Sequence, residues 1–435
     1  MLKVGSKYYV TEYGAKVCDS LQTQYIQRAI DDCFLNGGGI VVIPSGIFRT
    51  GGLRLRSNVT LYLESGAILT GSSDPEDYNS YIHDEIEPIN EPNNAGLARS
   101  VYPHSRWQNA IIRAIDAKNI AIIGEKGAYI NGVNCFDPQG EETYRGPHAI
   151  NMHRCENIHL EGYAVTDSAN WAHAIFTSQN ITARNLTVYG GHDGFDIRTC
   201  DNVLIEDCSF YTGDDCIAGF DNHDVIIRNC IFDTACSALR FGGNNILVEN
   251  CHSSAPSRFS HRGSLSPEKK AMNAPTDSSC RHNMLTAFLY YCDFRAKIRR
   301  APGDILIRNC TFENPDTLFQ LNFGNYIWCC NRSLSSITYE NCQISGVCLP
   351  IQICGDPKEP LTFAIKNSTI SVRKGYEKEF VIDASHFERI TLDNVTLEGY
   401  EEPTAVCRTE GTIEVVNSTP RAIHHTDEPT NFQPI

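Results

Sequence analysis

Three aspartates in the middle of the chain have the residue type and the spacing that acid–base chemistry needs. Asp193 lies in the segment GHDGFDI, which is followed 21 residues later by TGDDCIA with Asp214 and Asp215. When carboxyl groups lie close together, ionising all of them costs Coulomb energy, so the pKa of at least one rises. A carboxyl that keeps its proton beside ionised ones can protonate a glycosidic oxygen while the others activate water. The three aspartates are therefore candidates for glycoside hydrolysis.

Two other interpretations of these aspartates stay open. Asp-Gly and Gly-Asp-Asp are ordinary turn sequences, so a single aspartate here needs no catalytic explanation. Clustered carboxylate oxygens are also the ligands that Ca²⁺ prefers. The common register of the three acids, with His192, Arg198 and Arg240 beside them in the repeat, favours chemistry over turns.

A repeat of coils must position these acids. The segments ENIHLEGYAV, QNITARNLTV, DNVLIEDCSF, HDVIIRNCIF and NNILVENCHS are copies of one unit, and their anchor residues are separated by 23, 22, 22 and 21 residues. Each copy alternates apolar and polar residues and is rich in Val, Ile and Thr, which indicates short strands. The leucine consensus of leucine-rich repeats is absent. The pattern predicts an all-β fold, a parallel β-helix in which each coil stacks on the one before.

Stacking converts distances along the sequence into neighbours in space. Adjacent coils lie about 4.8 Å apart. Asp193 and Asp215 fall thirteen residues beyond successive anchors, so they should be vertical neighbours, with Asp214 next to Asp215 along the chain. The repeat therefore predicts that three carboxylates converge.

Composition limits the partners and the surroundings of the protein. The 435 residues include 52 Asp and Glu against 37 Lys and Arg, a formal charge of −15 that opposes binding to nucleic acid or to anionic membranes. The sequence offers no membrane span or export signal, so we expect a cytoplasmic protein. The 19 cysteines are then expected as reduced thiols. Five of them share one repeat position and are expected in the core: Cys208, Cys230, Cys251, Cys310 and Cys342.

The chain is expected to form a single β-helix domain over residues 1–435. An amino-terminal cap occupies about residues 1–50, where Leu21–Phe34 has the apolar spacing of a short amphipathic helix and is followed by a glycine stop. Two long interruptions, at about residues 72–108 and 252–302, break the repeat. Long loops are usually functional, and on a β-helix they would form walls beside a groove.

The two aspartate segments resemble motifs of glycoside hydrolase family 28, the polygalacturonases. The stretches VTEYGAKVCDSLQTQYIQRAIDDC and GGGIVVIPSGIFRTGGLRLRSNVTLYLESGAIL are similar to the amino-terminal coils of bacterial members, so the resemblance covers roughly residues 8–250. It implies a right-handed β-helix and an inverting hydrolase without a metal cofactor. In that scheme Asp214 is the general acid, and Asp193 and Asp215 hold the attacking water.

Three departures from the family pattern bear on the substrate. Gly191 and His192 stand where the motif has Asn and Thr. The histidine that supports the acid in the family falls at Cys236, and a thiol does not supply the same charge or hydrogen bonds. The Arg-Ile-Lys motif that grips a galacturonate carboxylate is absent, and residues 260–262, Ser-His-Arg, stand nearest to it. The sequence therefore points away from plain homogalacturonan.

Five residues are the candidates for contacting a sugar. They are His192, Arg240, Trp171, His261 and Arg262. Trp171 could stack on a sugar ring, or it could pack in the core at a coil corner. His173, Arg240 and His261 share an offset of sixteen from their anchors and are expected to form a polar column. Arg262 could instead be a solvated loop charge.

These features predict a hydrolase that cleaves oligosaccharides derived from pectin or a related polysaccharide. Walls beside the groove would favour cleavage from a chain end. A calcium-dependent polysaccharide lyase, with arginine as the base and the aspartates as metal ligands, is the first alternative. A carbohydrate-binding β-helix that has lost catalysis is the second, because the supporting histidine and the basic motif are missing.

Overall fold

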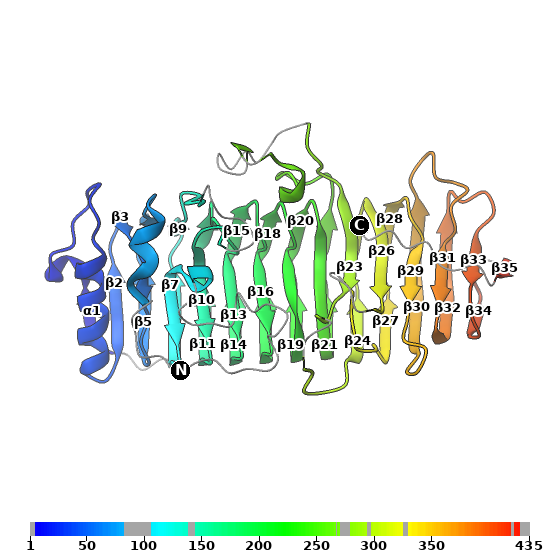
Figure 1. Cartoon of the computed structure of the whole chain (residues 1–435), viewed down its shortest axis with the longest axis horizontal. Coiled ribbons are helices and arrows are strands. Elements are labelled where there is room, and N and C mark those ends of the chain that lie inside the picture. Colours follow the sequence, from blue (N-terminus) through cyan, green and yellow to red (C-terminus); the bar gives the residue numbers. More distant parts are fainter. Residues whose placement is uncertain are drawn as a thin grey trace.

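The computed structural model describes residues 5–81, 106–137, 144–266, 268–269, 279–293, 297–324, 329–418 and 422–426. Short strands pair in parallel with the strands of the next coil, and Figure 1 shows the coils as a row along the long axis of the molecule. This is a right-handed parallel β-helix, which confirms the predicted fold class. Parallel strands buried between neighbouring coils explain the abundance of Val and Ile in the repeats.

Each coil has three strand faces. The first face consists of β1 (Lys7–Tyr9), β2 (Gly39–Ile43), β5 (Val59–Leu63), β8 (Lys118–Gly124), β11 (Glu156–Glu161), β14 (Gln179–Arg184), β17 (Asp201–Glu206), the later part of β19 (Ile217–Arg228) and of β21 (Ser237–Glu249), β24 (Gly303–Arg308), β27 (Ser336–Glu340), the first part of β30 (Leu361–Val372) and of β32 (Phe387–Glu398), and β34 (Thr412–Val416).

The other two faces complete the coil. The second face consists of β3 (Gly46–Thr50), β6 (Ala67–Gly71), β9 (Tyr129–Asn131), β12 (Ala164–Thr166), β15 (Thr187–Gly190), β18 (Ser209–Thr212), β20 (Ile231–Thr234), β22 (His252–Ser254), β25 (Thr311–Glu313), β28 (Gln343–Val347) and the ends of β30 and β32. The third face consists of β4 (Leu53–Arg54), β7 (Ala110–Ile115), β10 (His148–His153), β13 (His173–Phe176), β16 (Phe195–Arg198), the starts of β19 and β21, β23 (Met284–Tyr290), β26 (Pro315–Asn322), β29 (Ile351–Cys354), β31 (Ile382–Ser385), β33 (Thr404–Cys407) and β35 (Ala422–His425).

The anchor asparagines of the repeat form a ladder along the first face. Asn180 donates from Nδ2 to Asn157 Oδ1 at 2.9 Å, and Asn202 donates to Asn180 Oδ1 at 3.1 Å. Each of these residues has a positive φ near 57°, a backbone region that asparagine tolerates better than most residues. The ladder explains why the spacing of the anchors sets the register of the coils.

We expect Asn180→Ala to lower the free energy of unfolding by about 2 kcal/mol, because it removes two ladder hydrogen bonds and places alanine in the left-handed region. Asn180→Gly loses the same hydrogen bonds but tolerates the positive φ, so it should cost about half as much. Urea denaturation of both variants measures the difference. Equal losses would mean that the backbone conformation contributes nothing to the effect.

The predicted cap is present at one end of the row. Helix α1 (Thr23–Leu35) buries Ile26, Ala29, Ile30 and Cys33 and contacts β1, β2 and β4 (Figure 1). The helix ends where residues 37 and 38, both glycine, take positive φ angles of 90° and 104°. It covers strand edges that would otherwise invite pairing with another chain.

The repeated cysteines are core residues, as predicted. All five are at most 3% exposed. Cys208 immediately precedes Ser209 and Cys230 immediately precedes Ile231, and these two strand residues pair with each other. The backbone N–H of Cys251 donates to Cys310 Sγ at 3.4 Å. Stacked thiols therefore fill one corner of the coil.

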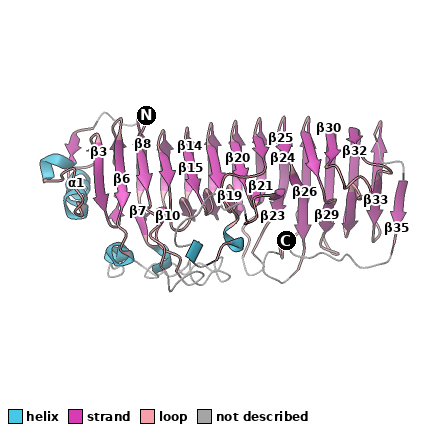
Figure 2. Ribbon diagram, turned by 90° about the horizontal axis from the view of Figure 1, so that it is seen from above, coloured by secondary structure: helices cyan, strands magenta, loops and turns pink. Residues whose placement is uncertain are grey.

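Parts of the two interruptions are described. The 3₁₀ helices η2 (Pro75–Tyr81) and η4 (Arg106–Gln108) lie in the first, and η5 (Arg262–Ser264) lies in the second. Residues 82–105, 267, 270–278 and 294–296 of these interruptions fall outside the described residues. Figure 2 shows short helices along one side of the row of strands. No helix among the described ranges is long and apolar enough to cross a membrane.

Candidate active site

The three aspartates occupy turns between the second and third faces of adjacent coils. Asp193 follows β15, and Asp214 and Asp215 follow β18. The backbone N–H of Gly194 donates to the Asp215 carbonyl at 3.0 Å, which fixes the register of the two turns. An oxygen of each of the three carboxylates lies within 4.8 Å of an oxygen of the other two. The structure brings these aspartates together as the repeat predicts, and their catalytic role stays a prediction.

Arg240 of β21 holds two of the acids in place. Its Nε donates to Asp215 Oδ2, and its Nη2 lies 3.4 Å from Asp193 Oδ2. Its guanidinium also lies 4.8 Å from the centre of the Tyr291 ring, and the residue is only 6% exposed. The donors of Arg240 are thus directed at carboxylates of the protein, and its predicted contact with the sugar stays a prediction.

The three carboxyl groups differ in their affinity for a proton. Burial raises the pKa of Asp193 well above its usual value, and the negative charges of Asp214 and Asp215 raise it further. Burial also raises the pKa of Asp215, although Arg240 opposes the shift. Burial pushes the pKa of Asp214 upward too, but the positive charges of His261, Arg145 and Arg240 outweigh it and lower the pKa.

These directions favour a proton on Asp193 over one on Asp214 in the free protein. The sequence predicts a proton within the cluster, but it assigns the acid role to Asp214. Asp214 is the half-buried member of the three, whereas Asp193 and Asp215 are 2% and 1% exposed. Asp214 is therefore the carboxyl that a bound sugar can reach, and it must acquire its proton before it can act as an acid.

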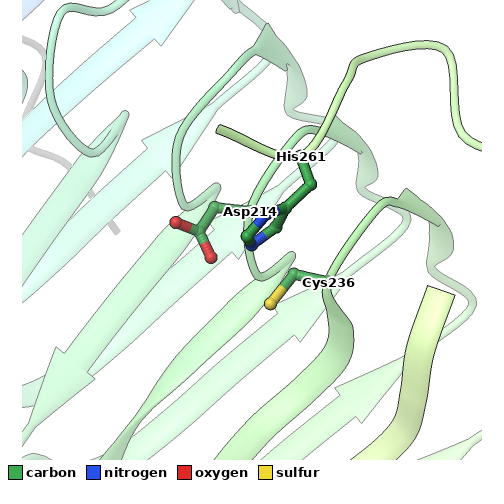
Figure 3. A group of neighbouring side chains, drawn as sticks. All are labelled: Asp214, Cys236 and His261. Atoms are coloured by element: carbon green, nitrogen blue, oxygen red, sulfur yellow. The ribbon is translucent and has the colours of Figure 1, made fainter. Parts of the chain in front are cut away.

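A histidine reaches Asp214 from the second interruption of the repeat. Figure 3 shows His261, Cys236 and Asp214 side by side, and donor atoms of the three lie within 4.8 Å of one another. Two glycines permit this approach. A Cβ on Gly213 would lie 2.3 Å from the Ser260 carbonyl oxygen, and a Cβ on Gly263 would lie 2.7 Å from His261 Cε1. Cys236 thus occupies the position of the family histidine, and the imidazole of His261, from the second interruption, lies beside Asp214 instead.

Cys236 is not an activated nucleophile. Burial raises the pKa of its thiol well above the usual value, and the negative charges of Asp215 and Asp214 add to the shift. A thiol with a raised pKa carries little thiolate at neutral pH.

The structure favours core packing for Trp171. The residue is 6% exposed, its ring meets that of Trp107 edge to face at 5.8 Å, and the Arg198 guanidinium lies 4.6 Å above it. Arg198 in turn makes a two-pronged ion pair with Asp196, at 2.7 and 2.8 Å. The expectation that Trp171 stacks on a sugar is not supported, because neighbouring side chains cover its ring.

The remaining predicted contacts differ in their exposure to solvent. His192 is 2% exposed, and its Nδ1 lies 3.4 Å from Arg145 Nη1. Arg262 is 3% exposed with its guanidinium 4.8 Å above the Phe136 ring, so the alternative of a solvated loop charge is wrong. His261 is half-buried and is the best placed of the five candidates to touch a ligand beside Asp214.

Sequence reasoning missed two cationic side chains and one acid. Arg145 lowers the pKa of Asp214 through its charge. Arg281 lies near enough to Cys236 and Asp214 for their charges to affect its own pKa, which burial lowers. Asp196 is fully buried. Like Arg240, it lies sixteen residues beyond the anchor of its repeat, so the repeat alignment could have identified it as a neighbour of Arg240.

We expect Asp193→Asn to flatten the pH dependence of stability. The pKa of Asp193 is higher in the native state than in the unfolded state. At a pH between these two pKa values, the native state therefore binds a proton that the unfolded state has released. The free energy of unfolding therefore falls as the pH rises from about 4 through the native pKa of Asp193. Asparagine cannot ionise, so the variant should lose this decline and be at least as stable as the wild type at neutral pH. Urea denaturation across this range measures the slope, and an unchanged slope would contradict the shift.

Comparison with known proteins finds similarity to polygalacturonases. The model of the family described as glycosyl hydrolases family 28 matches residues 94–235, a range that contains all three aspartates. A probable polygalacturonase of Vitis vinifera is 26% identical over 222 residues, which cover 47% of this chain and 43% of that protein. An exo-poly-alpha-D-galacturonosidase of Dickeya chrysanthemi is 25% identical over 248 residues, which cover 48% of this chain and 41% of that protein. The chain thus spans less than half the length of these relatives.

The solved structures show the same fold. An exopolygalacturonase from Thermotoga maritima has a TM-score of 0.66 at 17% identity, with 91% of this chain and 92% of that chain covered. The fold that these comparisons define is the parallel β-helix. More particularly, residues 94–235 are similar to the glycosyl hydrolases family 28.

Proposed function

We propose that the protein is a glycoside hydrolase that cleaves acidic oligosaccharides derived from pectin or a related polysaccharide. The observation that carries the proposal is the convergence of three carboxylates within 4.8 Å at a turn where one of them is half-buried. Positive side chains surround that carboxylate: His261, Arg145 and Arg240. They favour a sugar that carries a negative charge, although the chain as a whole is acidic.

The proposed mechanism assigns one role to each acid. Asp214 donates its proton to the glycosidic oxygen as the bond from that oxygen to the anomeric carbon breaks. Asp193 and Asp215 orient a water molecule, whose oxygen attacks the anomeric carbon and whose proton passes to one of these two carboxylates. Arg240 is a positioning residue that keeps both water-binding carboxylates on the same side of Asp214.

Binding of the substrate would cause Asp214 to take up a proton. A uronate carboxylate bound between His261 and Arg145 would offset the positive charges that lower the pKa of Asp214. The pKa of Asp214 would then rise, and the proton held by Asp193 could pass across the cluster. An acidic sugar would thus be required for protonation of the acid as well as for binding.

Stereochemistry, point of attack and location are further parts of the proposal. The family resemblance supports inversion, whereas the general spacing rule associates closely spaced carboxyl groups with retention. Attack at a chain end is supported by the described segment of the second interruption, whose Ser257 Oγ donates to the Thr212 carbonyl beside the site. Action in the reducing cytoplasm stays a prediction, with which the nineteen free thiols agree.

The test is an incubation of the purified protein with acidic pectin oligosaccharides of defined length, both oligogalacturonides and oligosaccharides that contain other sugars. We expect new reducing ends, single sugar units as the first products, and a first-formed anomer of inverted configuration by ¹H NMR. Ultraviolet absorbance from an unsaturated product, abolished by EDTA, would establish a lyase instead. Retained binding in calorimetry without new reducing ends, across neutral and acidic oligosaccharides, would establish a binding protein.

A further inference from the structure

Asp214, Cys236 and His261 form a mixed group of donors beside the acidic cluster. They offer a carboxylate, a thiol and an imidazole, whose donor atoms all lie within 4.8 Å of one another (Figure 3). Asp214 and Cys236 occupy equivalent turns of adjacent coils, and His261 comes from the segment after β22. All three side chains are half-buried, so an ion can reach them from solvent and their rotamers can adjust.

We propose that these three residues bind a Zn²⁺ ion. Sulfur, nitrogen and carboxylate oxygen are the ligands that Zn²⁺ takes, whereas Ca²⁺ and Mg²⁺ select oxygen alone. Ligand distances of about 2.0–2.3 Å imply donor-to-donor separations of about 3.3–3.7 Å around a tetrahedral ion. The present separations therefore need only a modest contraction. Three protein ligands leave a fourth position for water, and Cys236 releases its thiol proton to solvent when it binds the metal.

The backbone on both sides of the group is fixed. The N–H of Cys236 donates to Thr234 Oγ1 at 2.9 Å, and its carbonyl accepts from Leu285 N at 2.8 Å. The N–H of His261 donates to the Arg281 carbonyl at 2.7 Å. A site whose supporting backbone is already in place loses less entropy when the ion binds.

The charges around the group oppose one another. Arg145 and Arg281 disfavour a cation, since both act electrostatically on Asp214. Asp215 favours it, because its carboxylate lies within 4.8 Å of that of Asp214. The thiolate ligand therefore decides which metal binds, and Zn²⁺ should exceed Ca²⁺ and Mg²⁺ in affinity.

Metal binding would also switch off the proposed hydrolase, a consequence that rests on the proposed function. The Asp214 carboxylate cannot hold a metal ion and donate a proton at the same time. Zn²⁺ should therefore inhibit hydrolysis, and EDTA should restore it.

The binding test uses Co²⁺ as a coloured substitute for Zn²⁺. We expect the full-length protein to show the near-ultraviolet absorption of a cobalt–thiolate bond, to lose it when Zn²⁺ is added, and to bind about one equivalent of metal. Cys236→Ser should abolish the band and weaken Zn²⁺ binding at least about 100-fold. Cys280→Ser is the matched control: Cys280 is a half-exposed thiol in the same interruption, outside the donor group, and the variant should keep the band.

Further outcomes separate this proposal from the others. His261→Gln should weaken the binding of Zn²⁺ while leaving the melting temperature of the metal-free protein near that of the wild type. Absence of binding, or a band that survives in Cys236→Ser, would overturn the metal site. A band that depends on Cys236 in a protein without hydrolase activity would uphold the site and overturn the proposed function.

Discussion

Asp214→Asn is expected to lower kcat by a factor of about 10²–10⁴, the range typical of a lost general acid. Asparagine has nearly the same shape but cannot transfer a proton. The Oδ1 atom of Asp214 accepts the backbone N–H of Asp215 at 3.1 Å, a hydrogen bond that the amide oxygen of asparagine can keep. The melting temperature should therefore change little. Initial rates on an oligogalacturonide, with melting followed by circular dichroism, measure both quantities.

Asp233→Asn is a suitable control for this loss. Asp233 lies on β20, one coil further along, accepts the backbone N–H of Arg258 at 2.8 Å, and is not one of the three grouped carboxylates. We expect that variant to keep its activity. Wild-type turnover in Asp214→Asn would contradict the assigned role, and equal losses in both variants would indicate a general disturbance of the coils.

Arg240→Leu is expected to lower the free energy of unfolding by about 3–5 kcal/mol and to abolish hydrolysis. The change leaves Asp215 and Asp193 buried without the guanidinium that pairs with both. A buried carboxylate without its cation would take up a proton, so the stability deficit should shrink as the pH falls. Urea denaturation at several pH values measures the deficit and its direction.

Two further variants make this result specific. Arg240→Lys keeps the charge but cannot direct two donors at two carboxylates, so it should recover part of the stability and little of the activity. Arg408→Leu breaks a comparable pair with Asp383, at 2.6 and 2.8 Å, on coils far along the chain from the site. It should cost stability and leave kcat unchanged. A deficit in Arg240→Leu that does not depend on pH would contradict the charge argument.

The regular part of the molecule was predictable from the sequence because one spacing governs it. The steps between anchors place Asp193 and Asp215 on equivalent turns, and the structure has them there. The cap helix and the cysteine column follow from apolar spacing in the same way.

The polar column of His173, Arg240 and His261 was only partly correct. Arg240 does align with Asp196, two coils away. His173 instead pairs with Phe195. Paired residues of these two coils are 23 residues apart on the first face but 22 residues apart on the third face, so the alignment of the anchors is off by one residue at His173. It lies in the core with its Nδ1 on the Gly194 carbonyl.

Two of the charges near Asp214, Arg145 and Arg281, could not be predicted, because they come from segments outside the repeat. His261 and Arg281 belong to the second interruption, and Arg145 follows β9 in a stretch without the repeat pattern. Spacing carries no information where the chain leaves the coil. The direction of the pKa shift of Asp214 depends on these loop charges, so the proton's place on Asp193 could not be foreseen either.

The parallel stacking of coils also determines where local unfolding of the molecule begins. Every coil is held mainly by its two neighbours, so fraying begins at the two ends of the row and proceeds inward. The turns between β15 and β21 lie several coils from either end (Figure 1). Amide protons there should exchange with solvent far more slowly than those of the outermost coils. The three aspartates therefore stay aligned while the end coils unfold locally.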